Sequence, residues 1–418
     1  MIQENFKDWL RKDVDLSRAY FMATLRWCVL GLVVGILCGA VGGVFHHGIE
    51  WGMEQFSAHP WLVYLLPVGG LAITAIYHGL KLCPDPGTNA VLRASATGEP
   101  VSARMAIAIF FSTIITQLVG GSGGREGAAL QLGGSVSGYL GRRLKVSRSV
   151  QRTMVLCGMA AVFSALFGTP VTAALFCLEV VRVGTMPYAA LVPCLISSLV
   201  ADQVSRLMGM KPTAFLIKAI PAVSAPVLVQ CALLGVLGGL VAILFCQAQH
   251  LSHHLFDKIS NPWIRVMAGS VLLILLTLLV GSHRYNGAGM AYVTQAIEEG
   301  QTTHFSFLLK ILFTAITLGC GFKGGEIVPC FFTGATFGCA LAPLLGMDPG
   351  LGAALGMVTV FCGAVNSPLA SLVLAVEVFG GDILALAALP IALSYLVSGG
   401  SSLYKNQVIL NSKLDLEG

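Results

Sequence analysis

Residues 121–138 read GSGGREGAALQLGGSVSG and place Arg125 and Glu126 between glycines, directly after the apolar run of residues 106–119. A glycine-rich turn that opens a helix presents unpaired backbone N–H groups at the positive end of the helix dipole, where anions bind. The segment lacks the GK[ST] continuation and the βαβ surroundings of a nucleotide phosphate loop. We therefore predict an anion site, at which Glu126 either caps the helix or exchanges a proton and competes with an anion for the same donors.

The composition identifies an integral membrane protein. Of the 418 residues, 56% are hydrophobic and only 11% are charged, whereas about a quarter of the residues of an ordinary soluble domain are charged. Some apolar stretches are about long enough to cross a bilayer, but others are short or interrupted by glycine and proline. We therefore expect closely packed helices, some of which break in mid-membrane. The apolar stretches include residues 27–45, 61–76, 106–119, 227–245, 266–280 and 383–397.

Two pairs of segments indicate that the chain consists of two homologous halves. FGTPVTAALFCLEV (167–180) parallels VNSPLASLVLAVEV (365–378), and both have Glu-Val beginning nine residues after the shared proline. GREGAALQLGG (124–134) parallels GEIVPCFFTGA (325–335) at nearly the same offset. Such repeats, with broken helices at equivalent places, are typical of transporters that bind their substrate at the midplane between repeats. The alternative is the ordinary recurrence of proline and small residues in a helical bundle.

The second half supplies an equivalent helix start. GFKGGEIVP, residues 321–329, again puts glycines before an apolar helix, with Glu326 inside the motif. Two such helices could point their N-termini at one central anion. Glu179 and Glu377 lie deeper in apolar, helical context, where we expect hydrogen-bonded structural groups. Tyr404 follows the last apolar segment, and by position alone it is an interfacial anchor.

We expect four regions along the chain. Residues 1–26 are charged and amphipathic, without the apolar core of a cleavable signal, and predict a cytoplasmic or interfacial helix. A first membrane repeat at 27–206, a second at 207–404 and a tail at 405–418 follow. Five basic residues without an acidic one at 141–152 indicate a cytoplasmic loop. A nucleic-acid patch is the weaker alternative, because the loop is short and lacks aromatic residues.

Nothing in the sequence indicates a cofactor, a metal site or an enzyme. The twelve cysteines are scattered singly, without CxxC or Cys/His spacing, and we expect small apolar side chains rather than disulfides or ligands. No HExxH or GxSxG motif is present.

The three motifs, in this order, resemble those of the CLC family of anion channels and anion/proton exchangers. GREGAALQLGG is similar to the family motif G-[KR]-E-G-P, GGEIVP to its G-x-F-x-P motif, and FGTPVTAALFCLEV to the segment that follows the first motif. The resemblance covers roughly residues 30–404. It implies an all-α, polytopic inverted-repeat fold and a homodimer in which each subunit holds its own pathway. It also implies that Glu126 is the gating, proton-carrying residue and that Tyr404 touches the central anion from the inner side.

Departures from the family pattern favour one branch. Val180 stands where chloride exchangers carry an internal proton glutamate, and PGTNAVLRA (86–94) replaces the chloride-binding serine motif G-S-G-I-P. Asn89 or Thr88 then takes the place of that serine. Ile327 replaces the aromatic residue of G-x-F-x-P, after the unusual Glu326, and Ala128 replaces the proline after GREG. Together these departures resemble the fluoride/proton antiporter branch, in which Met or Asn replaces the serine.

The resemblance thus implies a multi-pass protein of the inner, cytoplasmic membrane, with both termini cytoplasmic, that exports fluoride against inward proton flow. Such a small, tightly hydrated anion needs close N–H donors to replace its water. The expected partners are fluoride, protons, a second copy of the chain and the lipid bilayer, and a chloride-selective CLC channel or exchanger is the alternative function. Glu326 is also the candidate for the inner proton route. The expected anion-binding residues are Asn89, Thr88, Gly124, Arg125, Gly127, Ala128, Glu326, Ile327, Val328 and Tyr404.

Overall fold

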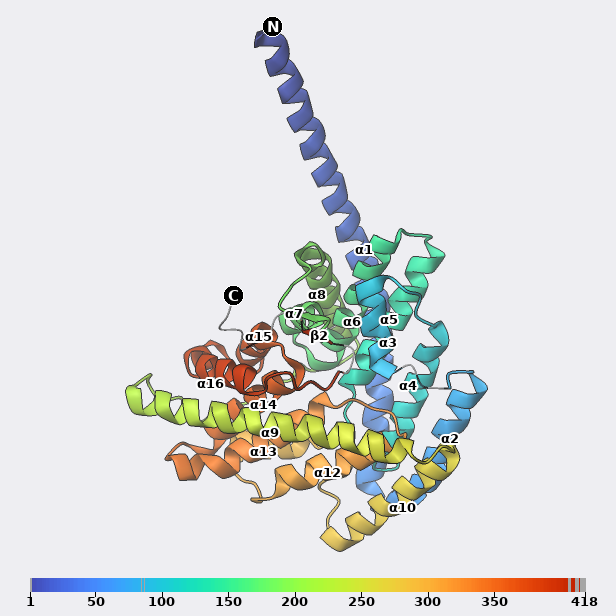
Figure 1. Ribbon diagram of the computed structural model, residues 1–418, viewed down its shortest axis with the longest axis vertical. Helices are drawn as coiled ribbons and strands as arrows, with labels where there is room; N and C mark the ends of the chain where they lie inside the picture. Colours follow the sequence, from blue (N-terminus) through green and yellow to red (C-terminus); the bar gives the residue numbers. More distant parts are fainter. Residues whose placement is uncertain (1, 84, 86, 405–406, 410–412, 414–418) are drawn as a thin grey trace.

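The computed structural model is almost entirely helical, as the sequence predicts (Figure 1). Sixteen α-helices lie in the described part of the chain, and the only strands described there are β1 and β2, of two residues each, which pair in parallel. The structure describes every residue except 1, 84, 86, 405–406, 410–412 and 414–418, with backbone alone for 2–16, 19–20 and 408.

The helices form two successive sets of eight in the same order. Each set begins with a long helix, and its fifth helix, α5 in the first set and α13 in the second, follows a glycine motif. The first set comprises α1 (Ile2–Ala58), η1 (Pro60–Leu65), α2 (Leu66–Gly79), α3 (Gly87–Thr97), α4 (Ala103–Leu118), α5 (Glu126–Arg143), α6 (Arg148–Phe167), α7 (Pro170–Glu179), β1 (Arg182–Val183), η2 (Tyr188–Ala190) and α8 (Leu191–Leu207). The second comprises α9 (Ala225–Asp257), α10 (Pro262–Val280), α11 (Met290–Thr294), η3 (Gln295–Glu299), α12 (Ser306–Gly319), α13 (Ile327–Leu341), η4 (Ala342–Leu345), α14 (Pro349–Val365), α15 (Pro368–Phe379), η5 (Gly381–Ile383), α16 (Leu384–Val397) and β2 (Val408–Ile409).

The helix lengths fit a membrane protein with broken segments. Among the described residues, seven helical segments are long and apolar enough to span a bilayer, and others, including α4, α7, α12 and α15, are apolar but shorter. Helix α1 runs unbroken from Ile2 to Ala58. The division expected after residue 26 is therefore not a break between two helices, because nothing in that stretch interrupts the backbone hydrogen bonds.

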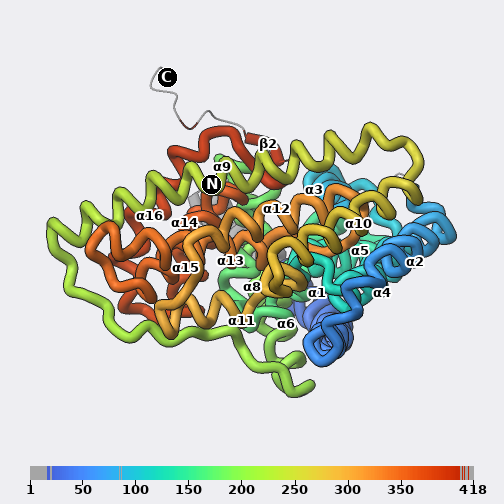
Figure 2. The backbone as a smooth tube through the Cα atoms, turned by 90° about the horizontal axis from the view of Figure 1, so that it is seen from below, coloured from blue at the N-terminus to red at the C-terminus, as the bar shows by residue number. Residues whose placement is uncertain are grey.

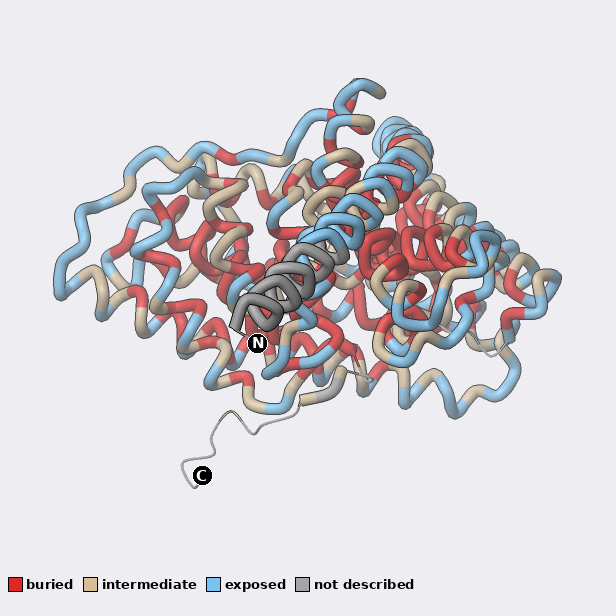
Figure 3. The backbone as a smooth tube through the Cα atoms, turned by 90° about the horizontal axis from the view of Figure 1, so that it is seen from above, coloured by how far each residue is buried: buried red, intermediate tan, exposed pale blue. Residues whose placement is uncertain are grey.

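The two sets pack against each other along their length. Helix α2 packs on α10 and α7 on α15, and Figure 2 shows α2 beside α10. Buried residues concentrate in the middle of the molecule and exposed ones on the outer helices (Figure 3). Helices α6 and α14, which hold equivalent places in the two sets, are largely buried, as are α5 and α13. The core therefore lies between the two halves and around the starts of α5 and α13.

Glycine contacts let the central helices approach closely. A Cβ added at Gly133 on α5 would lie 2.0 Å from the carbonyl oxygen of Gly158 on α6. At the equivalent place, a Cβ at Gly334 on α13 would lie 2.4 Å from the carbonyl oxygen of Gly356 on α14. No side chain fits in either gap, so the repeated small residues hold the two helix pairs together, as expected for small-residue packing in membranes.

Two carboxylates cap the broken helices of the opposite half. Glu179, at the end of α7, accepts hydrogen bonds of 3.1 and 2.8 Å from backbone N–H groups 369–370 at the start of α15. Glu377, near the end of α15, accepts hydrogen bonds of 3.0 and 2.8 Å from groups 171–172 at the start of α7. These N–H groups have no partner within their own helices and could not stay unpaired in a membrane. The prediction that both glutamates are hydrogen-bonded structural groups is confirmed.

Replacing Glu179 by Gln tests this cap. The amide keeps one acceptor oxygen but turns an NH2 group toward a second N–H donor, so we expect the free energy of unfolding to fall by about 1–3 kcal/mol, the cost of an unsatisfied buried group. Thermal unfolding of the purified protein in detergent measures the loss. The exposed Glu54, changed in the same way, is the matched control. Equal unfolding temperatures for the two variants would contradict the capping role.

Candidate functional site

The starts of α5 and α13 are joined backbone to backbone. Gly124 donates a hydrogen bond of 2.6 Å to the carbonyl of Gly325, and Gly325 donates one of 2.8 Å to the carbonyl of Gly124. The two residues form an isolated antiparallel bridge. A Cβ added at Gly325 would lie 2.5 Å from the backbone nitrogen of Gly127, so this approach requires glycine. The expected meeting of the two helix starts is thus confirmed.

Threonines from the preceding helices hold both loops in place. The Thr317 hydroxyl on α12 accepts a hydrogen bond of 3.1 Å from the backbone N–H of Ser122, in the first loop. The Thr116 hydroxyl on α4 accepts one of 3.3 Å from the N–H of Lys323, in the second loop. Each half therefore fixes the loop of the other half, and the two helix starts cannot shift independently.

Glu126 lies fully buried where the two helices meet. Its Oε2 accepts hydrogen bonds of 3.0 Å from the backbone N–H of Arg125 and 3.3 Å from that of Val328, at the start of α13. Its Oε1 has no hydrogen-bond partner among the described residues, and the Arg125 Nε lies 3.6 Å away. One carboxylate oxygen thus holds the converging N–H groups that an anion would need. A proton on the other oxygen would weaken that hold by removing the charge. The two interpretations of Glu126, as a helix cap and as a competitor of an anion, are compatible, because both involve the same N–H groups.

The equivalent residue of the second half carries no charge. Ile327 takes the place of Glu126 at the start of α13 and is fully buried. Ala128 is also fully buried, in the first turn of α5. Glu126 therefore caps both helix starts, whereas the neighbouring Glu326 makes no side-chain capping hydrogen bond to α13.

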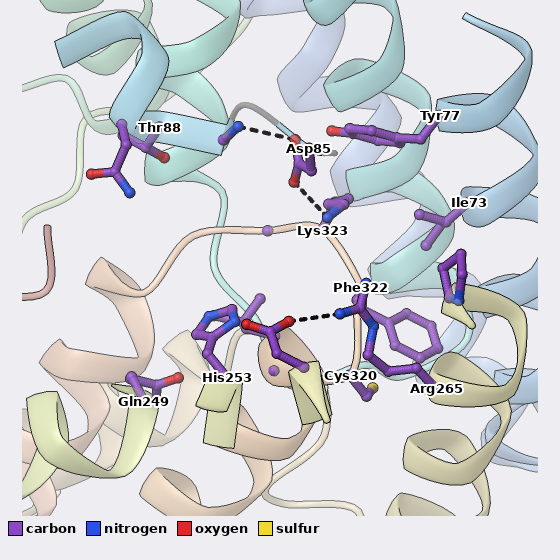
Figure 4. A pocket seen from close by; sticks show the side chains of 18 of the residues that line it. Ile73, Tyr77, Asp85, Thr88, Gln249, His253, Arg265, Cys320, Phe322 and Lys323 are labelled. Carbon is purple, nitrogen blue, oxygen red and sulfur yellow. Dashed lines mark hydrogen bonds and ion pairs between the residues drawn. The ribbon is translucent and has the colours of Figure 1, made fainter. Parts of the chain in front are cut away.

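A cavity of about 620 Å³ reaches this region from one side (Figure 4). It collects four of the predicted residues, namely Thr88, Asn89, Glu326 and Tyr404. The other predicted residues, on α5 and α13, do not line it. Two ion pairs stand in its wall, from Lys323 to Asp85 at 2.6 Å and from Arg265 to Asp257 at 2.7 Å. The cavity is thus a polar vestibule that ends near the helix starts.

Thr88 and Asn89, the two alternatives for the missing serine, both line the cavity at the start of α3. The Thr88 hydroxyl accepts a hydrogen bond of 3.0 Å from the Gln131 Nε2 on α5, and it lies 3.5 Å from the carbonyl of Gly127. Gln131 is buried, and its own oxygen has no hydrogen-bond partner in the described structure. Sequence reasoning missed Gln131, although an amide among small and apolar residues is a signal for a polar site.

Tyr404 is buried and not an interfacial anchor, because only 3% of its surface is exposed. Its hydroxyl lacks a hydrogen-bond partner within the described residues, and the residue lines the cavity. The chain after it is fixed by Gln407, whose Nε2 donates hydrogen bonds of 3.0 Å to the carbonyl of Val180 and 2.8 Å to that of Val365. Strand β2 then pairs with β1. The C-terminal segment thus attaches to both halves and positions Tyr404.

Two further polar residues were missed by sequence reasoning. Lys310, in α12, is fully buried, and its Nζ donates hydrogen bonds to the carbonyls of Tyr285 and Gly287. His46, in α1, contacts the Arg125 guanidinium. Each stands within an apolar segment, which is the available signal, since ionisable groups inside a membrane are costly unless paired.

Comparisons with known proteins show which family and fold the chain shares. A model of the voltage gated chloride channel family matches residues 69–399. A chloride/fluoride channel protein of Pseudomonas syringae pv. tomato is 36% identical over 398 residues, covering 93% of this chain and 87% of that protein. The crystal structure of a CLC-type fluoride/proton antiporter superposes with a TM-score of 0.89 at 30% identity, covering 92% of this chain and 98% of the other. A slow cyanobacterial Cl-/H+ antiporter shares the fold, with a TM-score of 0.73 at 21% identity over 89% of this chain and 94% of its own.

Replacing Gln407 by Leu tests how the C-terminal segment is held. The change removes two hydrogen bonds to backbone carbonyls and two that the Gln407 oxygen accepts from Asn366 and Ser402, each worth about 1 kcal/mol. We therefore expect amide hydrogen exchange in β2 to accelerate about tenfold or more. Hydrogen–deuterium exchange with mass spectrometry measures the rate. The exposed Gln301 supplies the control substitution. Unchanged exchange in the Gln407→Leu protein would show that the strand pair alone holds the segment.

Proposed function

Because the chain belongs to the voltage-gated chloride channel (CLC) family, we propose that it exports fluoride across the cytoplasmic membrane in exchange for protons. Glu126 is the group that alternates between a position on the helix N–H groups and a proton-bound position. The function is therefore ion transport, not enzymatic catalysis.

One observation carries the proposal: Glu126 Oε2 accepts hydrogen bonds from both helix starts at once. An anion that arrives from the cavity needs the same N–H groups, so it can bind only after the carboxylate leaves. Protonation favours that departure, because a neutral carboxyl is a weaker acceptor than a carboxylate. The anion and the ionised Glu126 carboxylate therefore cannot occupy the same N–H groups at the same time. This exclusion couples the movement of the anion to the movement of protons in the opposite direction.

Three features favour fluoride over chloride. Fluoride is close in size to a carboxylate oxygen, and the N–H groups of Arg125 and Val328 already hold such an oxygen at 3.0 and 3.3 Å. PGTNAVLRA, with Asn89 or Thr88 in place of the serine, stands where the chloride-binding motif is expected. The relatives named for fluoride are 36% and 30% identical to this chain. A chloride-selective channel or exchanger is the second candidate, favoured by the chloride named in the first of these relatives.

Glu326 is our candidate for proton transfer on the cavity side. It is the residue before the first turn of α13, it makes no side-chain capping hydrogen bond, and it lines the cavity. Val180 offers no proton-accepting group at the place used by chloride exchangers. A carboxylate that faces the vestibule near Gly127 can receive the proton that Glu126 releases. Tyr404, with Thr88 or Asn89, then contacts the anion from the same side.

We further infer that both termini lie on the cytoplasmic side and that the protein works as a homodimer. Figure 1 places the loop between α5 and α6 on the same side of the molecule as the N-terminal part of α1. That loop belongs to the basic segment 141–152, and positively charged segments remain cytoplasmic. The homodimer rests on the family resemblance, since each subunit contains a complete site.

The substrate is tested with purified protein in liposomes. Vesicles loaded with fluoride or with chloride are diluted into anion-free buffer, and anion efflux and proton uptake are recorded together with an anion electrode and a pH electrode. We expect rapid fluoride efflux with matching proton uptake and little chloride efflux. Chloride that leaves as readily as fluoride, or fluoride that leaves without proton uptake, would overturn the proposal.

Glu126 is tested by the neutral variant Glu126→Gln in the same vesicles. The amide cannot carry a proton at neutral pH, so we expect proton uptake to fall to the leak of protein-free vesicles, whether or not fluoride still moves. The exposed Glu99, changed to Gln, is expected to keep full exchange. Full proton coupling in the Glu126→Gln protein would remove Glu126 from the role proposed for it.

A further inference from the structure

A row of polar side chains connects the buried gating residue Glu126 to the exposed carboxylate of Glu50 on α1. Glu50 Oε1 lies 2.9 Å from His46 Nε2, and His46 Nδ1 lies 2.7 Å from Arg125 Nη1. Arg125 Nε in turn lies 3.6 Å from Glu126 Oε1. About half of the Glu50 side chain is exposed, whereas the His46 side chain is 9% exposed and Glu126 is fully buried. This row of polar side chains therefore runs from the protein surface to Glu126.

The contacts of His46 determine its protonation state. A guanidinium can only donate hydrogen bonds, so His46 Nδ1 must accept the bond from Arg125 and carries no proton. The ring proton is then on Nε2, which donates to Glu50. His46 is thus neutral in this arrangement, and a second ring proton would point at the Arg125 N–H group from 2.7 Å. Protonation of His46 and its bond to Arg125 exclude each other.

Besides His46 and Glu126, the Arg125 side chain contacts a third group. Its Nη2 donates a hydrogen bond of 3.1 Å to the carbonyl of Leu166, at the end of α6. His46 and the Leu166 carbonyl together hold the guanidinium beside Glu126, and neither lines the cavity. If His46 no longer accepts this hydrogen bond, the guanidinium loses its contact with α1 and can move, with its positive charge, away from Glu126.

We propose that His46 is a positioning residue for the exchange: its neutral ring holds Arg125 beside Glu126, and protonation of the ring releases Arg125. This inference rests on the proposed function of Glu126. Removal of the nearby positive charge makes ionised Glu126 less favourable, so Glu126 takes up its own proton more readily and leaves the helix N–H groups. A lower pH on the side of the protein where Glu50 is exposed therefore accelerates the exchange. No change in the residues that line the cavity is needed for this effect.

The groups that face His46 are few. Arg125 approaches from the start of α5, and Glu50 and His47 stand on α1, with the two histidine rings 5.9 Å apart. His47 is exposed; its Nε2 lies 3.0 Å from the carbonyl of Met208, just after α8, and its Nδ1 lies 3.9 Å from Glu50 Oε2. It is the matched control, because it has the same chemistry and neighbours His46 but is not bonded to Arg125.

The experiment measures fluoride efflux from vesicles between about pH 4.5 and pH 7.5, a range that extends below ordinary histidine titration because burial and the bond to Arg125 oppose the second ring proton. Both sides are shifted together, so that the proton gradient stays constant. We expect the wild-type rate to rise toward acid pH by about fivefold or more relative to His46→Gln, the lower range of ordinary coupling between two sites. The Gln oxygen still accepts a bond from Arg125 but does not titrate. His47→Gln is expected to follow the wild-type profile.

A His46→Gln protein with the wild-type pH profile would overturn the inference. Glu50→Gln provides a second test that does not depend on the folding of the first variant: without the carboxylate His46 is harder to protonate, so the midpoint of the acid rise moves to lower pH. An unchanged midpoint would also overturn the inference. Wild-type vesicles that move no fluoride, or move it without protons, would instead refute the proposed function, which separates the two failures.

Discussion

The pair of hydrogen bonds between Gly124 and Gly325 is the constraint on which the rest of the structure depends. It fixes the starts of α5 and α13 against each other, so that backbone N–H groups from both halves converge on one point. A membrane interior supplies no water to satisfy such groups. Something charged or polar must therefore occupy the point of convergence, and the chain supplies Glu126.

The N–H groups at the other helix starts and loops also need hydrogen-bond acceptors, but the acceptors there do not compete with an anion. Glu179 and Glu377 each accept two N–H groups from the opposite half, and the threonine hydroxyls on α4 and α12 hold the two glycine loops. The repeat symmetry thus makes the scaffold rigid. It is broken at the centre, where α13 begins with Ile327 and α5 begins with Glu126. One carboxylate shared by two helix starts can be displaced by one anion, whereas two carboxylates would repel each other there.

Much of this arrangement could be predicted from sequence, and the rest depended on contacts that sequence spacing does not encode. The motifs at residues 124 and 325 predicted the repeat, the all-α fold and the meeting of two helix starts. Spacing could not show that Glu179 and Glu377 cap each other's helices, since that needs the relative position of the halves. Lone polar residues such as His46 signalled a partner but not which one. Tyr404 was misjudged by position alone, because the turn that buries it is set by Gln407, far from any motif.

The geometry also decides which contacts can tune the exchange. The N–H groups of α5 and α13 bind the ionised carboxylate and an incoming anion alike, so strengthening them stabilises both states and changes their ratio little. A contact shifts the balance only if it reaches Glu126 without reaching the anion. Arg125 meets this condition, because its guanidinium faces Oε1, away from the oxygen held by the helix starts. Control of the gate therefore belongs to the residues that hold Arg125 in place, beyond the anion site itself.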